Sequence, residues 1–80
     1  MSLNDQKRIL LRDMLIYRRK ELNLTQAELA SKLSKPQSFV SKYESGERKI
    51  DAVELIDLIQ CFGDVPSNFI KQYCSNLEKK

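Results

Sequence analysis

Residues 24–46 read LTQAELASKLSKPQSFVSKYESG, and this stretch decides the fold. Thr25 followed three residues later by Glu28 is a capping box, in which each side chain bonds to the other's backbone N–H at the start of a helix. That helix is short, because Pro36 disfavours helical conformation in the residue before it. Pro36 itself fits the first turn of a second helix, which we expect to reach residue 43 or 44 before Gly46 ends it. The stretch therefore predicts two short helices joined by a tight turn.

Further helices are predicted on both sides of this pair. Apolar residues recur at helical spacing over residues 5–22 and 66–77, and a third apolar segment covers residues 51–62. No segment has the alternating pattern of a strand. The sequence therefore predicts a compact, all-α, five-helix fold. We expect a single domain over residues 1–80, with a helix-turn-helix at about residues 25–45.

The segment 51–62 is the most apolar of the predicted helices. Asp51 and Glu54 repeat the capping-box pattern at its start, and Gly63 favours a left-handed C-cap after its end. The polar side chains form only a narrow strip, made of Glu54, Asp57 and Gln60. We therefore expect this helix to be buried on most sides.

The composition, 41% hydrophobic and 31% charged, is that of an ordinary folded protein. No apolar run approaches the roughly 18 residues that a membrane span needs, and the N-terminus is too polar for a secretory signal, so we expect a cytoplasmic protein without a membrane partner. Histidine is absent, and Cys61 and Cys74 lack the spacing of metal ligands. We expect no metal or other cofactor, interpret both cysteines as reduced packing residues, and regard an enzyme as disfavoured because its usual catalytic groups are missing.

Charge is unevenly distributed along the chain, whose net charge is +3. Residues 1–49 contain eleven Lys and Arg against six Asp and Glu, whereas residues 50–80 contain three against five. The first region is therefore the one that a polyanion would meet, and the two regions are expected to present different faces to partners. The alternative is scattered charge that only promotes solubility.

The second helix of the central pair has two distinct faces. Val40 and Tyr43 share the inner face, and the outer face is polar, with Gln37, Ser38, Ser41 and Lys42. Two short helices joined by a turn, the second with a polar outer face, can present side chains in a DNA major groove.

The segments LTQAELA at residues 24–30 and QSFVSKYESG at residues 37–46 closely resemble the Xre family of phage Cro and repressor-like proteins. The resemblance extends over nearly the whole chain. It implies a five-helix repressor-type domain that binds a double-stranded DNA operator as a homodimer, with the third helix as recognition helix.

DNA contacts follow from this resemblance position by position. Gln37, Ser38 and Lys42 match base-contacting positions, and Gln26 matches a position that holds a phosphate through its side chain and the helix N-terminus. Further phosphate contacts are assigned on or just after the recognition helix, to Ser41, Ser45, Arg48 and Lys49. The alternative for these side chains is an ordinary solvated surface.

Other matching positions are structural. Arg19 and Glu44 match family positions that form a salt bridge, expected to be partly buried beneath the recognition helix, and Ala30 matches a small residue that lets the two helices cross closely. Ser34 stands where the family usually has glycine, which tolerates positive φ, so we expect a strained or differently shaped turn. Pro36 replaces a more usual capping Ser or Thr.

A symmetric dimer is expected because one recognition helix reads too few base pairs to select a site in a genome. The operator should then be an approximate palindrome. The apolar stripe of segment 66–77 is the expected dimer contact, together with surplus apolar surface on segment 51–62; the stripe consists of Phe69, Ile70, Tyr73 and Leu77. The alternative is an antitoxin or other interaction module on the same fold, with a protein partner such as a toxin.

Overall fold

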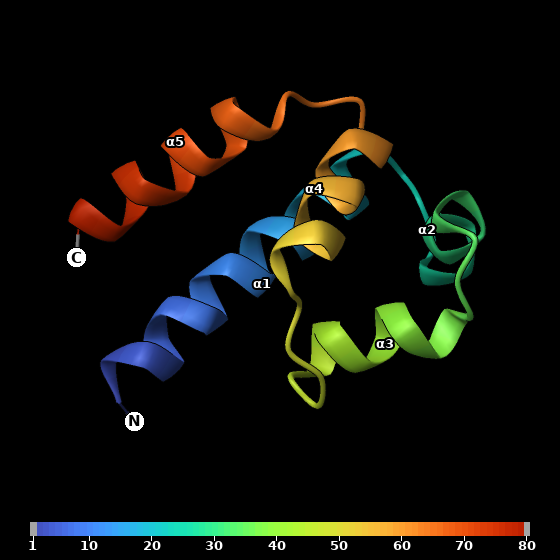
Figure 1. Cartoon of the computed structure of the whole chain (residues 1–80), viewed down its shortest axis with the longest axis horizontal. Helices are drawn as coiled ribbons and strands as arrows, with labels where there is room; N and C mark the ends of the chain where they lie inside the picture. The colour runs from blue at the N-terminus through green and yellow to red at the C-terminus, as the bar shows by residue number, and fades with distance from the viewer. Residues whose placement is uncertain (1, 80) are drawn as a thin grey trace.

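The computed structural model describes residues 2–79, and within them it contains five helices and no strand (Figure 1). The predicted all-α five-helix fold is therefore confirmed. The helices are α1 (Leu3–Glu21), α2 (Gln26–Leu33), α3 (Gln37–Ser45), α4 (Ala52–Cys61) and α5 (Pro66–Glu78).

Capping boxes set where several of these helices begin. Those at Thr25 and Asp51 form as expected, each N-cap oxygen accepting a hydrogen bond from the backbone N–H three residues later. A further capping box joins Ser2 to Asp5, so α1 begins at Leu3, two residues before the predicted start. The helical spacing of apolar residues missed this turn because its side chains face solvent.

The start of α3 differs from the prediction. Pro36 is the N-cap of α3 and does not lie inside its first turn, since its φ of −64° is accompanied by an extended ψ of 151°. Proline fixes φ near a value that helical and extended conformations share, so the sequence alone did not determine ψ. The helix then continues through Ser45, one or two residues beyond the expected end, and Gly46 caps it with a φ of 87°.

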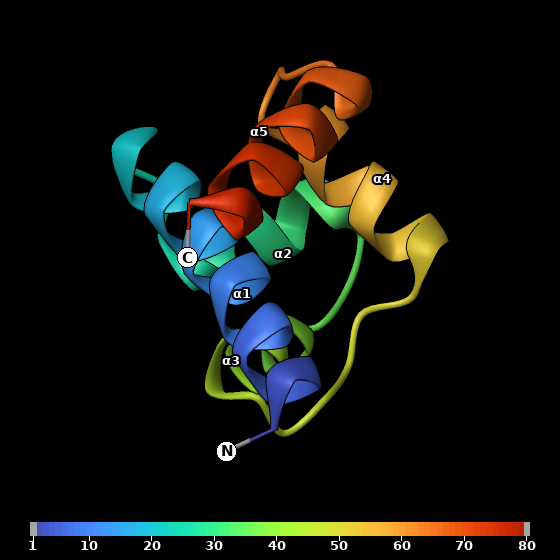
Figure 2. The same ribbon diagram turned by 90° about the vertical axis from the view of Figure 1, so that its left-hand side faces the viewer.

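The helices pack in a ring, in which α1 contacts α3 and α5, α2 contacts α3 and α4, and α4 contacts α5. In the turned view α1 runs between α5 above and α3 below, and α2 packs against both α3 and α4 (Figure 2). Side chains from four of these helices meet in the core, where the fully buried residues include Leu15, Leu29, Val40, Tyr43 and Leu58.

The expectation that the fourth helix is buried on most sides is wrong. Leu58 and Ile59 are fully buried, but Val53 is 68% exposed and Ile56 is 41% exposed. A helix that packs against the core through one side only leaves the apolar residues of its other side in solvent. The apolar surplus of α4 is therefore surface.

The two cysteines lie in different surroundings. Cys61 is half-buried, and burial raises the pKa of its thiol. Cys74 is exposed, so its interpretation as a packing residue is wrong. Both are free thiols.

No helix among residues 2–79 is long and apolar enough to cross a membrane.

Ion pairs connect the basic and acidic regions of the chain. Arg18 on α1 donates two hydrogen bonds, of 2.7 and 2.8 Å, to Asp64 in the loop before α5. Arg48 likewise donates two, of 2.9 and 2.8 Å, to Glu54 on α4. The two regions are therefore less separate than their charge counts suggest.

Candidate nucleic-acid interface

The outer face of α3 carries the side chains expected to contact bases. Gln37, Ser38 and Lys42 are all exposed, and Ser38 and Lys42 are four residues apart, which places them on one face of the helix. None of the three is used in the core. They are available to a molecule that lies along α3.

The inner face of α3 fixes the helix in place. Val40 and Tyr43 are fully buried, and Phe39 is only 8% exposed. The rings of Phe39 and Tyr43 lie 5.6 Å apart in an edge-to-face arrangement. Phe39 was not identified as a core residue from the sequence, although its position beside Val40 is compatible with the same buried face.

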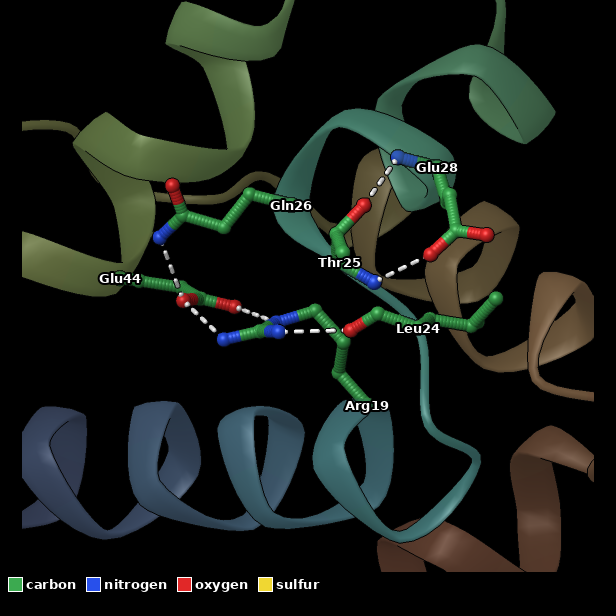
Figure 3. Close-up of polar contacts among 6 residues, drawn as sticks. All are labelled: Arg19, Leu24, Thr25, Gln26, Glu28 and Glu44. Carbon is green, nitrogen blue, oxygen red and sulfur yellow. Dashed lines mark hydrogen bonds and ion pairs between the residues drawn. The ribbon is translucent and has the colours of Figure 1, made fainter.

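Arg19 and Glu44 form the central polar contact between α1 and α3 (Figure 3). The guanidinium donates to both carboxylate oxygens, at 2.7 and 3.0 Å, and also to the backbone carbonyl of Leu24 at 2.7 Å. Only 10% of the Arg19 side chain and 7% of the Glu44 side chain are exposed. The hydrogen bonds to Glu44 raise the pKa of Arg19, so this buried arginine is charged. The structure thus brings together the pair expected from the family resemblance.

Gln26 extends this contact to the start of α2. Its side-chain amide donates a hydrogen bond of 2.9 Å to Glu44 (Figure 3). The capping box uses the N–H groups of Thr25 and Glu28, which leaves those of Gln26 and Ala27, at the start of the helix, without an intrahelical partner. An anion at this helix end would meet free N–H groups beside an oriented glutamine.

Ser41 and Ser45 lie on the same helix as the expected base contacts. The Ser41 hydroxyl donates to the carbonyl of Ser38 at 3.3 Å, and the Ser45 hydroxyl donates to the carbonyl of Lys42 at 3.0 Å. Each hydroxyl oxygen can still accept, and each can rotate its proton toward another acceptor.

Arg48 and Lys49, expected together as phosphate contacts, lie in different environments. The Arg48 guanidinium is paired with Glu54 and lies 4.9 Å from the centre of the Phe39 ring. Arg48 thus joins the loop to both α3 and α4. Its hydrogen bonds to Glu54 lower the pKa of that carboxyl group. Lys49 is exposed and makes no ion pair among residues 2–79.

The apolar stripe of α5 is only partly free. Phe69 packs against the core, and the Tyr73 hydroxyl donates to the backbone carbonyl of Lys7 at 3.0 Å. Leu77 is half-buried, whereas Ile70 is 43% exposed. Ile70 is therefore the member of the stripe most available to another molecule.

Comparison with known proteins places this geometry in a family. A sequence model described as helix-turn-helix matches residues 15–70, which include all of α2, α3 and α4. The chain belongs to the Xre-like helix-turn-helix family. A solved structure, an XRE-family like protein from Pseudomonas syringae pv. tomato str. DC3000, shares 34% sequence identity, with a TM-score of 0.87 over 91% of this chain and 89% of that one. No curated protein matches the chain.

Membership of the Xre-like family gives the fold a class of function, because this is a family of DNA-binding regulators. The matched segment holds both helices of the predicted motif and the Arg19–Glu44 pair that joins α3 to α1. In this Xre-like chain the exposed polar face of α3 is thus the candidate nucleic-acid surface.

Proposed function

We propose that this protein is a sequence-specific transcriptional regulator that reads a palindromic operator as a homodimer, with α3 in the major groove. The observation that carries the proposal is the division of α3 into two faces. Gln37, Ser38 and Lys42 point to solvent, while the opposite face is fixed by buried aromatic and aliphatic residues.

The three exposed side chains supply the chemistry of base recognition. A glutamine amide can donate to and accept from adenine at once, and a lysine reaches the O6 and N7 acceptors of guanine. A serine hydroxyl donates or accepts. Gln37 and Lys42 are therefore assigned the largest part in sequence discrimination, with Ser38 beside them.

Backbone phosphates would be held around this helix. The start of α2, with Gln26, offers N–H groups and a helix dipole, and Ser41 and Ser45 offer hydroxyls. Lys49, in the following loop, makes no ion pair with any residue from 2 to 79, and Arg48 keeps N–H groups beyond those bonded to Glu54. Such contacts fix the register on DNA without reading its sequence.

A homodimer would place two copies of α3 on successive turns of the major groove, roughly 34 Å apart. The exposed Ile70 and the neighbouring half-buried side chains Phe69, Tyr73 and Leu77 support α5 as the contact surface. Between α1 and α5 lies a cavity of about 500 Å³, lined in part by Met14, Tyr17 and Phe69, which adds apolar surface on this side.

Selection of bound duplexes from a random DNA library, followed by footprinting of the enriched site, tests this function. We expect an approximate palindrome protected over two half-sites. A library that shows no sequence enrichment would contradict DNA reading. One asymmetric protected half-site, with a monomer's sedimentation mass on DNA at micromolar protein, would contradict the dimer.

The dimer surface is tested separately by sedimentation of Ile70→Asp. We expect dissociation, because an aspartate in an apolar contact must be desolvated. Val53→Asp on the exposed side of α4 is the matched control. If only the Val53 variant dissociates, the interface lies on α4 and not on α5.

A second candidate is an antitoxin or other protein-interaction module on the same fold. It is favoured by the exposed apolar side chains on α1 and α4, where Tyr17 is 68%, Val53 68% and Ile56 41% exposed. A gel shift with genomic fragments separates the two candidates. Binding that requires a co-purified protein would favour the module, and binding by the isolated chain favours the regulator.

A further inference from the structure

A cavity of about 340 Å³ lies beside α3, between the first half of α1 and the segment that leads to α4. Its walls include the end of α3 at Ser45 and Gly46. Four cationic side chains and one acidic side chain line it; they are Arg8, Arg12, Arg48, Lys49 and Asp5. None of the helix-turn-helix base contacts proposed above lies in it.

Only one of these five charges has an ion-pair partner among residues 2–79. The Asp5 carboxylate accepts hydrogen bonds from Ser2 in the capping box of α1, and the Arg48 guanidinium is paired with Glu54. Among residues 2–79, Arg8, Arg12 and Lys49 make no ion pair. The cavity therefore gathers three cations without an ion pair in this part of the chain, offset only by the carboxylate of Asp5.

The helix end explains only one of these cations. A β-carbon at Gly46 would lie 2.9 Å from an Arg12 guanidinium nitrogen, so this guanidinium sits directly against the C-cap of α3. A cation there is favoured by the partial negative charge of a helix C-terminus. Arg8 lies one turn before Arg12 on the same face of α1, so the two positive charges repel each other. The contact with the end of α3 that stabilises Arg12 does not account for Arg8. Lys49 is also left without such a role.

Tyr43 is a further wall of the same cavity. Its hydroxyl is buried and has no hydrogen-bond partner within the described part of the chain. A buried polar group without a partner is destabilising, but this hydroxyl is closed off from the cavity and is not one of the groups that would hold a ligand there.

We propose that this cavity binds a phosphoryl group, held by Arg8, Arg12 and Lys49. Anionic oxygens would meet three cations there. Two of these are arginines, whose planar guanidinium groups can bind a phosphate through two hydrogen bonds at once. The source of the group is either a DNA phosphate beyond those contacted by α2 and α3, which rests on the function proposed above, or a free phosphate. The DNA source is favoured because Ser45 and Lys49, two of the phosphate contacts proposed above, also line this cavity.

The test compares Arg8→Gln with Lys20→Gln, a variant that removes the same charge from an exposed residue on α1 outside the cavity. Two probes are used on the whole chain. The first is the salt dependence of binding to the selected operator, for which the loss of one phosphate contact lowers the slope of log K against log salt by about 0.9. The second is inorganic phosphate, added at constant ionic strength while the amide resonances of Gly46 and Lys49 are followed by NMR.

We expect Arg8→Gln, and not Lys20→Gln, to lower the slope by about one contact on DNA. A loss confined to the inorganic phosphate titration would identify a free phosphate as the source. If Arg8→Gln behaves like Lys20→Gln with both probes, the cavity is not a phosphoryl site. The phosphate titration gives its answer even if the protein selects no operator, so this inference and the proposed function fail separately.

Arg12→Gln is a second variant, because Arg8 alone contributes only part of the site. Its fold is checked by thermal melting, since Arg12 also lies against the end of α3. A variant that melts like the wild type and keeps the full response to both probes also counts against the proposal.

Discussion

The carboxylate of Glu44 and the guanidinium of Arg19 share two hydrogen bonds, of 2.7 and 3.0 Å, across the contact between α3 and α1. Both side chains are nearly excluded from solvent. The same carboxylate accepts a hydrogen bond from Gln26. The pair therefore fixes α3 against the end of α1 and the start of α2. The orientation of the proposed recognition helix is thus set by residues outside it.

Glu44→Ala should destabilise the protein by about 3 kcal/mol, because it leaves the Arg19 charge buried without its partner. Urea unfolding measures this loss. Glu21→Ala is the control, since Glu21 pairs with Arg18 at the surface and its loss should cost at most about 1 kcal/mol. Equal unfolding curves for Glu44→Ala and the wild type would show that the pair contributes nothing.

Lys42→Ala should weaken binding to the cognate operator by about 1–3 kcal/mol and binding to random DNA by less, if Lys42 reads a base. Lys49→Ala, at a proposed phosphate contact, should weaken both by similar amounts. Titrations of both variants on both duplexes separate the two classes. Equal losses for Lys42→Ala would move Lys42 to the phosphate class.

Ser34→Gly should stabilise the protein by up to about 1 kcal/mol, because Ser34 caps α2 with a left-handed φ of 56° that glycine adopts without steric cost. Ser31→Gly makes the same change inside α2, where it should destabilise by about 0.5 kcal/mol. The two thermal melts should therefore shift in opposite directions. A lower melting temperature for Ser34→Gly would mean that the turn carries no strain.

Acid should weaken the tie between α1 and the loop before α5. Hydrogen bonds from Arg18 lower the pKa of Asp64 in the folded protein. Its stabilising contribution is therefore complete above the ordinary carboxyl value of about 4, and is lost as the pH falls through the lowered value. Between about pH 5 and pH 2, Asp64→Asn should lose less stability than the wild type, while Asp57→Asn, at an exposed acid without an ion pair in residues 2–79, should follow the wild type.

Local signals predicted most of the fold. The helix caps act on backbone groups only a few residues away, so neighbouring residues are enough to predict them. These caps are the capping boxes of Thr25 with Glu28 and of Asp51 with Glu54, and the C-cap at Gly46. The outer face of α3 followed from helical spacing for the same reason. Pro36 was expected inside the first turn of α3 but is its N-cap. The sequence could not decide between the two, because the φ of proline is common to helical and extended conformations.

Contacts between distant residues were not predictable in this way. Nothing near Arg48 in the sequence indicates that Phe39 lies beneath it or that Glu54 neutralises it. The exposed side of α4 was missed because an apolar helix does not reveal how much of its circumference the neighbouring helices cover. The Arg19–Glu44 pair came from the family resemblance, and not from any feature of the two residues alone.

The capping boxes at the starts of α1, α2 and α4 have a kinetic consequence. Each box is closed by residues three positions apart, so these helix ends can form in the unfolded chain before any tertiary contact exists. The remaining search is the docking of short, locally nucleated helices, with little entropy lost in closing long loops. Helical proteins of this kind fold in microseconds to milliseconds. A newly made chain would therefore expose its apolar surfaces only briefly before reaching the folded state.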